Sequence, residues 1–156
     1  MIDDAFGNWP AGFLDGEASF LVRRDTNTGR LYPGLNVGLR ADDGPLLRRI
    51  MERTGIGTIQ GPWETKLGKP VLRWSVQARG DCLVLRDLLQ RYPLRSKKRR
   101  DFEVWSRAVD AIYAGDQDLL STLKVEIEQV RRWVDSESQM SVVAPSDRSQ
   151  MELVLR

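Results

Sequence analysis

Histidine is absent from this chain of 156 residues, and Cys82 is its one cysteine. Without histidine the chain has no Ser–His–Asp triad, no zinc site that depends on histidine, and no histidine base for hydrolysis. A single cysteine excludes an intrachain disulfide and a cysteine-rich metal cluster, so we expect a reducing, intracellular setting, the cytoplasm. The groups left for chemistry are carboxylates, lysine, arginine and the backbone. Their oxygens are the ligands that Mg²⁺ prefers.

Long apolar runs are also lacking. No stretch reaches the roughly 18 apolar residues of a membrane span, so we expect no membrane partner. The opening segment "MIDDAFGNWP" is acidic and lacks the basic and apolar regions of a secretion signal. Hydrophobic residues still make up 41% of the chain, which suffices for one core. We predict a single domain over residues 1–134 and a C-terminal tail or arm over residues 135–156.

Hydrophobic periodicity and turn residues divide the chain into helices and strands. The predicted helices cover residues 9–16, 41–55, 81–92, 99–115 and 118–134. The predicted strands cover residues 18–24, 31–40, 56–62 and 69–81. Within the strands, apolar residues alternate with polar ones. This order predicts an α+β fold in which helices cover one face of the sheet and a polar face that contains arginines stays open.

Basic residues gather in the segment "RYPLRSKKRRDF", residues 91–102. One interpretation is a solvated charge run at the start of a helix, which is the usual role of such runs. The other is an anion-binding surface, because clustered cations repel one another unless an anion lies nearby. The open sheet face favours the second interpretation. Polar strand residues suit the base edges of the DNA major groove, while the basic segment would hold phosphates.

The segment "WPAGFLDGEASF", residues 9–20, combines a helix of small residues with acids at its end, directly before a strand. It resembles the signature helix of the LAGLIDADG homing endonucleases, aligned from Pro10 to Ala18. The later "YPLRSKKRRDFEVW", residues 92–105, is similar to the second recurring segment of that family, in which a lysine lies near the active site. The predicted elements between them match the αββαββα core of the family. The resemblance covers roughly residues 5 to 115.

The resemblance implies an antiparallel, saddle-shaped sheet with helices on one face and double-stranded DNA on the other. One signature per chain implies a homodimer in which two signature helices lie side by side. Small residues would let the two backbones approach closely. The residues expected at this dimer interface are Pro10, Ala11, Gly12 and Asp15, with Gly16 on the same face.

The resemblance also implies metal-dependent hydrolysis of phosphodiester bonds. It makes the Glu17 carboxylate and the Gly16 carbonyl the metal ligands, with Mg²⁺ as the cofactor and Mn²⁺ or Ca²⁺ able to replace it for binding. Lys98, with Lys97 as the second candidate, would stabilise charge near the scissile phosphate.

Strand alternation and the family layout together predict the residues that face DNA. On the sheet these are Ser19, Arg23, Asn36, Gly38, Arg40, Thr58, Gln60, Arg73, Ser75 and Gln77. In the basic segment they are Arg95, Arg99 and Arg100. The sequence departs from the family pattern at Ala18, where the signature usually has glycine. It departs again at Arg40 and Ala41, where family members often carry a glutamine that organises water.

Three functions follow as hypotheses. The first is a site-specific double-stranded DNA endonuclease, or meganuclease, of the kind associated with intron homing. As a homodimer it would cut both strands across the minor groove of a long pseudo-palindromic target. The second is an inactive relative that binds nucleic acid, either a maturase for intron RNA or a DNA-binding regulator. The third is an oligomeric structural domain, which the concentrated basic segment disfavours.

Overall fold

The computed structural model describes residues 4–66 and 68–140, with side chains in the last segment up to residue 132. Within these residues there are five α-helices and four strands. The helices are α1 (Asp4–Glu17), α2 (Gly44–Thr54), α3 (Arg79–Arg91), α4 (Lys98–Ala114) and α5 (Gln117–Met140). The strands are β1 (Ser19–Arg24), β2 (Leu31–Arg40), β3 (Thr58–Trp63) and β4 (Val71–Val76), and a 3-10 turn η1 (Ala41–Asp43) precedes α2.

The order of elements confirms the predicted α+β, αββαββα arrangement. Most boundaries shift by a few residues from the sequence prediction, and three differences are the largest. Helix α1 begins at Asp4 instead of residue 9, and β4 ends at Val76 because residues 79–81 form the first turn of α3. Helix α5 continues to Met140, past the expected start of a tail at residue 135. The rest of the predicted tail, residues 141–156, lies outside the described residues.

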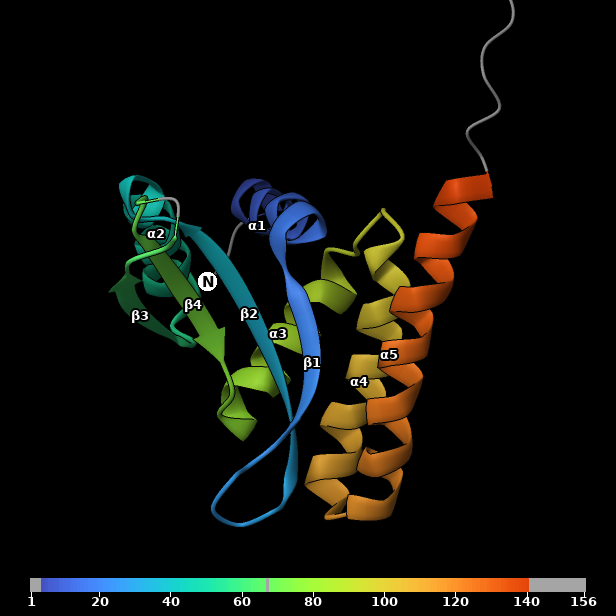
Figure 1. Ribbon diagram of the computed structural model, residues 1–156. Helices are drawn as coiled ribbons and strands as arrows, with labels where there is room; N and C mark the ends of the chain where they lie inside the picture. The colour runs from blue at the N-terminus through green and yellow to red at the C-terminus, as the bar shows by residue number, and fades with distance from the viewer. Residues whose placement is uncertain (1–3, 67, 141–156) are drawn as a thin grey trace, which may run out of the picture.

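The four strands form one antiparallel sheet in the order β1-β2-β4-β3. Figure 1 shows the twisted sheet with α3, α4 and α5 behind it and to one side, and α1 and α2 near its upper end. One row of paired residues crosses all four strands: Ser19, Asn36, Ser75 and Thr58. Because side chains alternate along a strand, this row and the rows two residues away share one face of the sheet.

The opposite face of the sheet packs on the helices. Phe20, Leu35 and Trp74 of the strands and Trp105 of α4 are fully buried. Trp74 Nε1 donates a hydrogen bond of 3.0 Å to the carbonyl of Ile56. The orientation of this buried ring is therefore set by both packing and a hydrogen bond. The core therefore lies between the sheet and the helices, and the other sheet face stays open.

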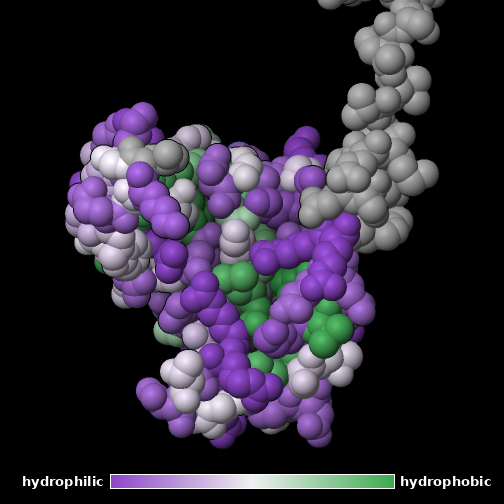
Figure 2. Space-filling model, viewed as in Figure 1, coloured by the Kyte–Doolittle hydropathy of each residue, from purple (hydrophilic) through white to green (hydrophobic). Residues whose placement is uncertain are grey.

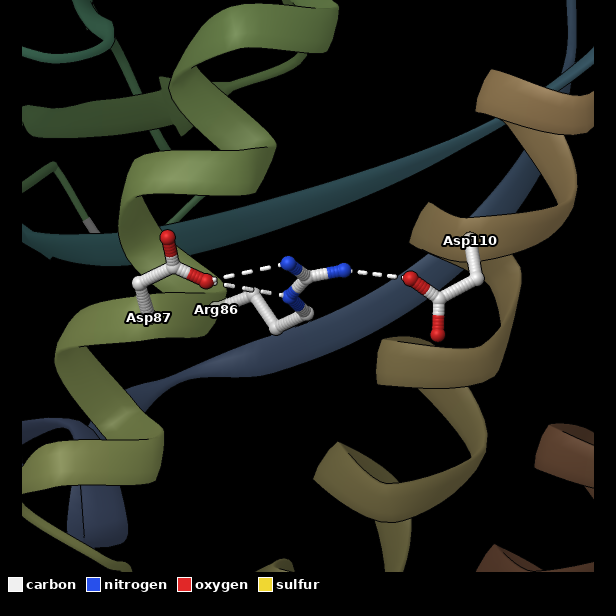
Figure 3. A network of polar contacts seen from close by, with 3 residues as sticks. All are labelled: Arg86, Asp87 and Asp110. Carbon is white, nitrogen blue, oxygen red and sulfur yellow. Dashed lines mark hydrogen bonds and ion pairs between the residues drawn. The ribbon is translucent and has the colours of Figure 1, made fainter.

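An ion-pair network joins two of the covering helices (Figure 3). Arg86 of α3 donates to the carboxylate of its neighbour Asp87, from Nε at 3.2 Å and from Nη2 at 3.0 Å. Its Nη1 donates to Asp110 of α4. The arginine side chain is mostly buried, whereas both carboxylates are largely exposed. The network thus links α3 to α4 on the side away from the open sheet face.

No helix in the described parts of the chain has the length and apolar character needed to cross a bilayer.

Candidate nucleic-acid interface and active site

Glu17 is the last residue of α1, and its side chain is exposed. A carboxylate at the C-terminal end of a helix lies at the negative pole of the helix dipole, which is unfavourable for the helix alone. Lys98, the first residue of α4, offsets this. Its Nζ donates to the Ala18 carbonyl at 2.5 Å and to the Gly16 carbonyl at 3.3 Å. The fold thus brings the predicted metal-ligating acid and the predicted catalytic lysine to the same helix end.

Asp15 makes the return connection from α1 to α4. Its carboxylate accepts hydrogen bonds from the backbone N–H groups of Arg95 and Ser96, each at 2.9 Å, and from the Ser96 hydroxyl at 2.6 Å. Partial burial favours the protonated form, but these hydrogen bonds outweigh it and lower the pKa of Asp15 below its ordinary value. Within the chain, the Asp15 carboxylate thus serves as an acceptor for the loop before α4, and its place at a dimer interface stays a prediction.

The two connections form a reciprocal clamp, by which we mean the contacts of Asp15 and Lys98 between α1 and α4. Asp15 caps the backbone N–H groups before α4, and Lys98 caps the carbonyls at the end of α1. Each charge lies at the helix end that stabilises it. Lys97 is exposed, and within the described part of the chain its ammonium makes no hydrogen bond with α1, so the geometry favours Lys98 over Lys97 as the lysine beside Glu17.

The basic segment divides into two groups. Arg91 pairs with Asp4 at 3.2 Å and Arg99 pairs with Glu103 at 3.1 Å, both on exposed surface. These pairs agree with the interpretation of a solvated charge run for part of the segment. Arg95 and Arg100 are also exposed, in the same segment as Lys98. They add positive charge to the segment that contains Lys98.

The residues predicted to contact DNA from β1, β2, β3 and β4 share the open face of the sheet. Gly38, Arg73 and Gln60 form one row of paired positions, and Arg23 lies on the same face of β1. Most of these side chains are exposed or partly exposed. Figure 2 shows that the surface in this view is largely hydrophilic, with small hydrophobic patches toward β1 and α5.

Two predicted contacts on this face are altered by hydrogen bonds within the chain. Ser75 is buried, and its hydroxyl lies 2.5 Å from the side-chain amide of Asn36. Gln77 Nε2 donates to the same hydroxyl at 3.3 Å. The Ser75 hydroxyl thus makes its polar contacts within the chain, and its part in DNA binding stays a prediction. Arg40 pairs with Asp42 at 2.5 Å on exposed surface, at the position where the family often has glutamine.

The exposed side of α1 carries glycine. A Cβ added to Gly12 or Gly16 would meet no atom within 4 Å, so this stripe of the helix is open. Pro10 and Ala11 are instead buried inside the chain. Both pack within the single chain, and their part in a dimer interface stays a prediction. Trp9, three residues before Gly12 in the same helix, is 40% exposed.

Ala18 occupies the position where the signature usually has glycine. Its backbone N–H donates to the Leu14 carbonyl at 3.0 Å, and its side chain is buried. No described non-glycine residue has a positive φ, so the transition from α1 to β1 does not require the left-handed backbone that glycine favours. Alanine is thus compatible with this turn.

The sequence analysis missed Trp63 as a member of the open face. Its indole is 42% exposed and lies under the guanidinium of Arg73, with 5.2 Å from Arg73 Cζ to the ring centroid. The available signal was the Gly61–Pro62 pair inside a strand pattern, because glycine and proline in a strand often mark a bulge. A bulge reverses the alternation of side chains that follow it.

The donor atoms near Glu17 suit a hard divalent cation. Glu17 offers an exposed carboxylate, and the Gly16 carbonyl, although it accepts from Lys98 at 3.3 Å, has a second lone pair. No group of three or more His, Cys, Asp or Glu side chains that could hold a metal occurs among the described residues. The residues at the end of α1 thus fit part of an oxygen-ligated site that other oxygens would complete.

A family model of the LAGLIDADG endonuclease matches residues 11–109, which include the clamp, the glycine stripe and all four strands. The chain belongs to the LAGLIDADG endonuclease family. A search of curated proteins gave no match.

Solved structures agree with this assignment. The LAGLIDADG meganuclease I-AabMI bound to uncleaved DNA is 28% identical, with a TM-score of 0.63; the match covers 70% of this chain and 38% of that one. The archaeal intron-encoded homing endonuclease I-Vdi141I complexed with DNA is 22% identical (TM-score 0.69, 81% and 84% covered). The homing endonuclease I-TnaI is 19% identical (TM-score 0.66, 83% and 96% covered). The latter two show the shared fold, and this chain spans about two fifths of the length of I-AabMI.

Proposed function

We propose that this LAGLIDADG chain is a site-specific double-stranded DNA endonuclease that works as a homodimer with divalent metal. The observation that carries the proposal is the joint position of Glu17 and Lys98 at the end of α1, where the helix leads directly into the open sheet face. A carboxylate and an ammonium group at the edge of a polar, arginine-bearing surface suit hydrolysis of a bound phosphodiester.

The open face of the sheet is the proposed DNA-binding surface. Its exposed arginines and amides can donate to and accept from base edges in the major groove. The basic residues around the clamp, Arg95 and Arg100 among them, would bind the phosphate backbone. Support comes from the family match and from the DNA complexes of I-AabMI and I-Vdi141I.

The open stripe of α1 supports the homodimer. Because a Cβ at Gly12 or Gly16 would meet nothing in the chain, a second backbone could approach there closely. Two-fold symmetry at this stripe would place a second Glu17 near the first. Each copy would then bring its own carboxylate and its own lysine to one of the two DNA strands.

Glu17 and the Gly16 carbonyl would hold the divalent cation, with Mg²⁺ as the expected ion. When bound, such an ion activates water and stabilises the leaving oxygen. Lys98 supplies a fixed positive charge beside the phosphate, since its ammonium is already held by two carbonyls. Preorganised charge of this kind stabilises a transition state without reorganisation during the reaction.

The test is cleavage of a library of duplex targets, or of the native host locus, in Mg²⁺ and in Ca²⁺. We expect cleavage in Mg²⁺ and binding without cleavage in Ca²⁺. Glu17→Gln should keep binding and lose cleavage, while the matched control Glu52→Gln, on the exposed side of α2, should behave as the wild type. Binding without cleavage under all metals would instead support the second candidate, a nucleic-acid-binding relative, and cleavage by Glu17→Gln would remove Glu17 from the reaction.

A further inference from the structure

Trp63 reaches the open face of the sheet through an irregularity in β3. Thr58 pairs with Ser75 and Gln60 with Arg73, but Trp63 then pairs with Val71. Three residues of β3 therefore span two residues of β4. Regular alternation would have turned Trp63 toward the helices, because it lies an odd number of residues from Gln60. The extra residue reverses its direction.

Gly61 is the residue that permits this bulge. Its φ is +100°, in the region that favours glycine. An added Cβ would lie 2.8 Å from the Val71 carbonyl oxygen and 3.1 Å from the Trp63 ring. Any other residue would strain the backbone and collide with the neighbouring strand. The local sequence is thus adapted to present an indole on a face that is otherwise polar.

The indole and Arg73 form one unit on that face. The guanidinium carbon of Arg73 lies 5.2 Å from the Trp63 ring centroid, within the range of a cation–π contact. Arg73 is exposed and central in the row between Gly38 and Gln60. The contact restricts the rotamers of a long, flexible side chain that remains exposed. A donor held in this way loses less freedom when it binds.

We propose that Trp63 is a specificity-determining residue of the DNA-binding face, which positions the Arg73 guanidinium to donate two hydrogen bonds to a guanine in the major groove. Arginine commonly pairs with the O6 and N7 acceptors of guanine. The inference rests on the proposed function, since it needs DNA on the open face. It gives Trp63 the role of orienting the Arg73 guanidinium that contacts the base, and Trp63 itself neither binds phosphate nor takes part in hydrolysis.

The test measures the base preference of the full chain at each position of its target, in Ca²⁺ so that binding is separated from cleavage. Arg73→Ala should lose preference for one G·C pair by about 5- to 150-fold. Trp63→Ala should lose preference at the same pair by about 2- to 5-fold. Trp63→Phe, which keeps an aromatic face, should retain most of it. The double variant should lose no more than Arg73→Ala alone.

Tyr113→Ala is the matched control, because Tyr113 is an exposed aromatic residue on α4. It should leave every base preference unchanged. Unchanged preference in Trp63→Ala, or an equal loss of affinity for all sequences, would overturn the inference while DNA binding and cleavage by the wild type still uphold the proposed function. Failure of the wild type to bind any duplex would overturn both. Melting temperatures of Trp63→Ala and Trp63→Phe show whether either variant is misfolded. If Trp63→Ala does not fold, the base preference of Trp63→Phe tests the inference, and loss of preference in a folded Trp63→Phe overturns it.

Discussion

The hydroxyl of Ser96 donates a 2.6 Å hydrogen bond to the carboxylate of Asp15, which joins the loop before α4 to the last turn of α1. The backbone N–H of the same serine donates to this carboxylate at 2.9 Å. Two residues after Ser96, Lys98 donates hydrogen bonds back to the Gly16 and Ala18 carbonyls, which follow Asp15 in the chain. The first acid of the signature therefore holds the lysine in place for the second acid, Glu17.

We predict that Asp15→Asn weakens both the fold and cleavage. Asparagine keeps one acceptor oxygen but turns an N–H₂ group toward backbone donors, so part of the clamp is lost. The free energy of unfolding should fall by about 1–2 kcal/mol in urea titrations. The control is Asp43→Asn, since Asp43 stands at the N-cap of α2 without a side-chain capping bond and its loss should cost little. Equal effects of the two substitutions would contradict the clamp.

The pH dependence of stability gives a second prediction for the same residue. Hydrogen bonds lower the pKa of Asp15 in the folded chain below its unfolded value of about 3.9. The stabilisation is therefore fully present above the unfolded pKa and is lost as pH falls through the folded pKa. The stability gap between wild type and Asp15→Asn should be constant at neutral pH and close during acid titration below about pH 4.

Asp101 provides a contrasting case. Burial raises its pKa above the ordinary value, although Arg131, Lys98 and Lys97 oppose the rise. Its contribution is fully present below the unfolded pKa and is lost as pH rises through the folded pKa. Asp101→Asn should therefore gain stability relative to wild type as pH rises from about 4, opposite in sign to Asp15→Asn. The same urea titrations measure both, and a shared sign would contradict the pKa assignments.

For Lys98 we predict a larger effect on rate than on affinity. Lys98→Ala removes the ammonium from the Gly16 and Ala18 carbonyls and from the vicinity of Glu17. Single-turnover cleavage should slow markedly, while binding in Ca²⁺ weakens less. Lys124→Ala is the control, because that lysine pairs with Glu128 on α5. If Lys98→Ala mainly weakened binding and reduced the salt slope by about one unit, Lys98 would be a phosphate anchor.

The sequence alone predicted the order of elements and the residues at the end of α1. Alternation placed Arg23, Gln60 and Arg73 on one sheet face, because strand periodicity is read directly from residue order. The resemblance made Glu17 and Lys98 candidates, and the structure brings Lys98 to the end of the helix that Glu17 closes, a contact between distant segments that no local pattern connects. Their hydrogen-bond geometry depends on how α4 packs against α1, which is tertiary information.

Three features that the sequence did not reveal have the same physical origin. Ala11 and Pro10 were expected on the dimer face because small residues permit close approach, but a small residue also fits a crowded core. Ser75 lies on the polar face but is buried, and its hydroxyl bonds to Asn36. Trp63 changes face at a bulge, which shifts the register by one residue. Burial and register both depend on neighbouring elements, so periodicity alone does not determine them.

The network in Figure 3 leads to a prediction about stability away from the DNA-binding surface. Asp110→Ala should change the free energy of unfolding by about 0–1 kcal/mol, because its carboxylate is exposed. Arg86→Ala should cost more, about 1–2 kcal/mol, since the mostly buried arginine stem packs between α3 and α4. Arg86→Met, which keeps the stem, should recover most of that loss in urea titrations. If Arg86→Ala cost no more than Asp110→Ala or Arg86→Met, packing of the arginine stem would be unimportant.

The last prediction separates the fold of one copy from association of two. Gly12→Val adds a side chain where the chain itself has open space, and valine is no worse than glycine inside a helix. Its melting temperature as a monomer should therefore be unchanged or higher. Two helices in close contact would be forced apart, so sedimentation should show loss of the dimer, together with loss of cleavage.

Gly80→Val is the matched control for this substitution. Gly80 also lies in a helix, α3, and an added Cβ there would likewise meet nothing within 4 Å. It stands away from the glycine stripe of α1, so this variant should remain dimeric and active. A dimer that survives Gly12→Val would place the partner on another surface, because no backbone could then be packed against this stripe at the distance that glycine permits.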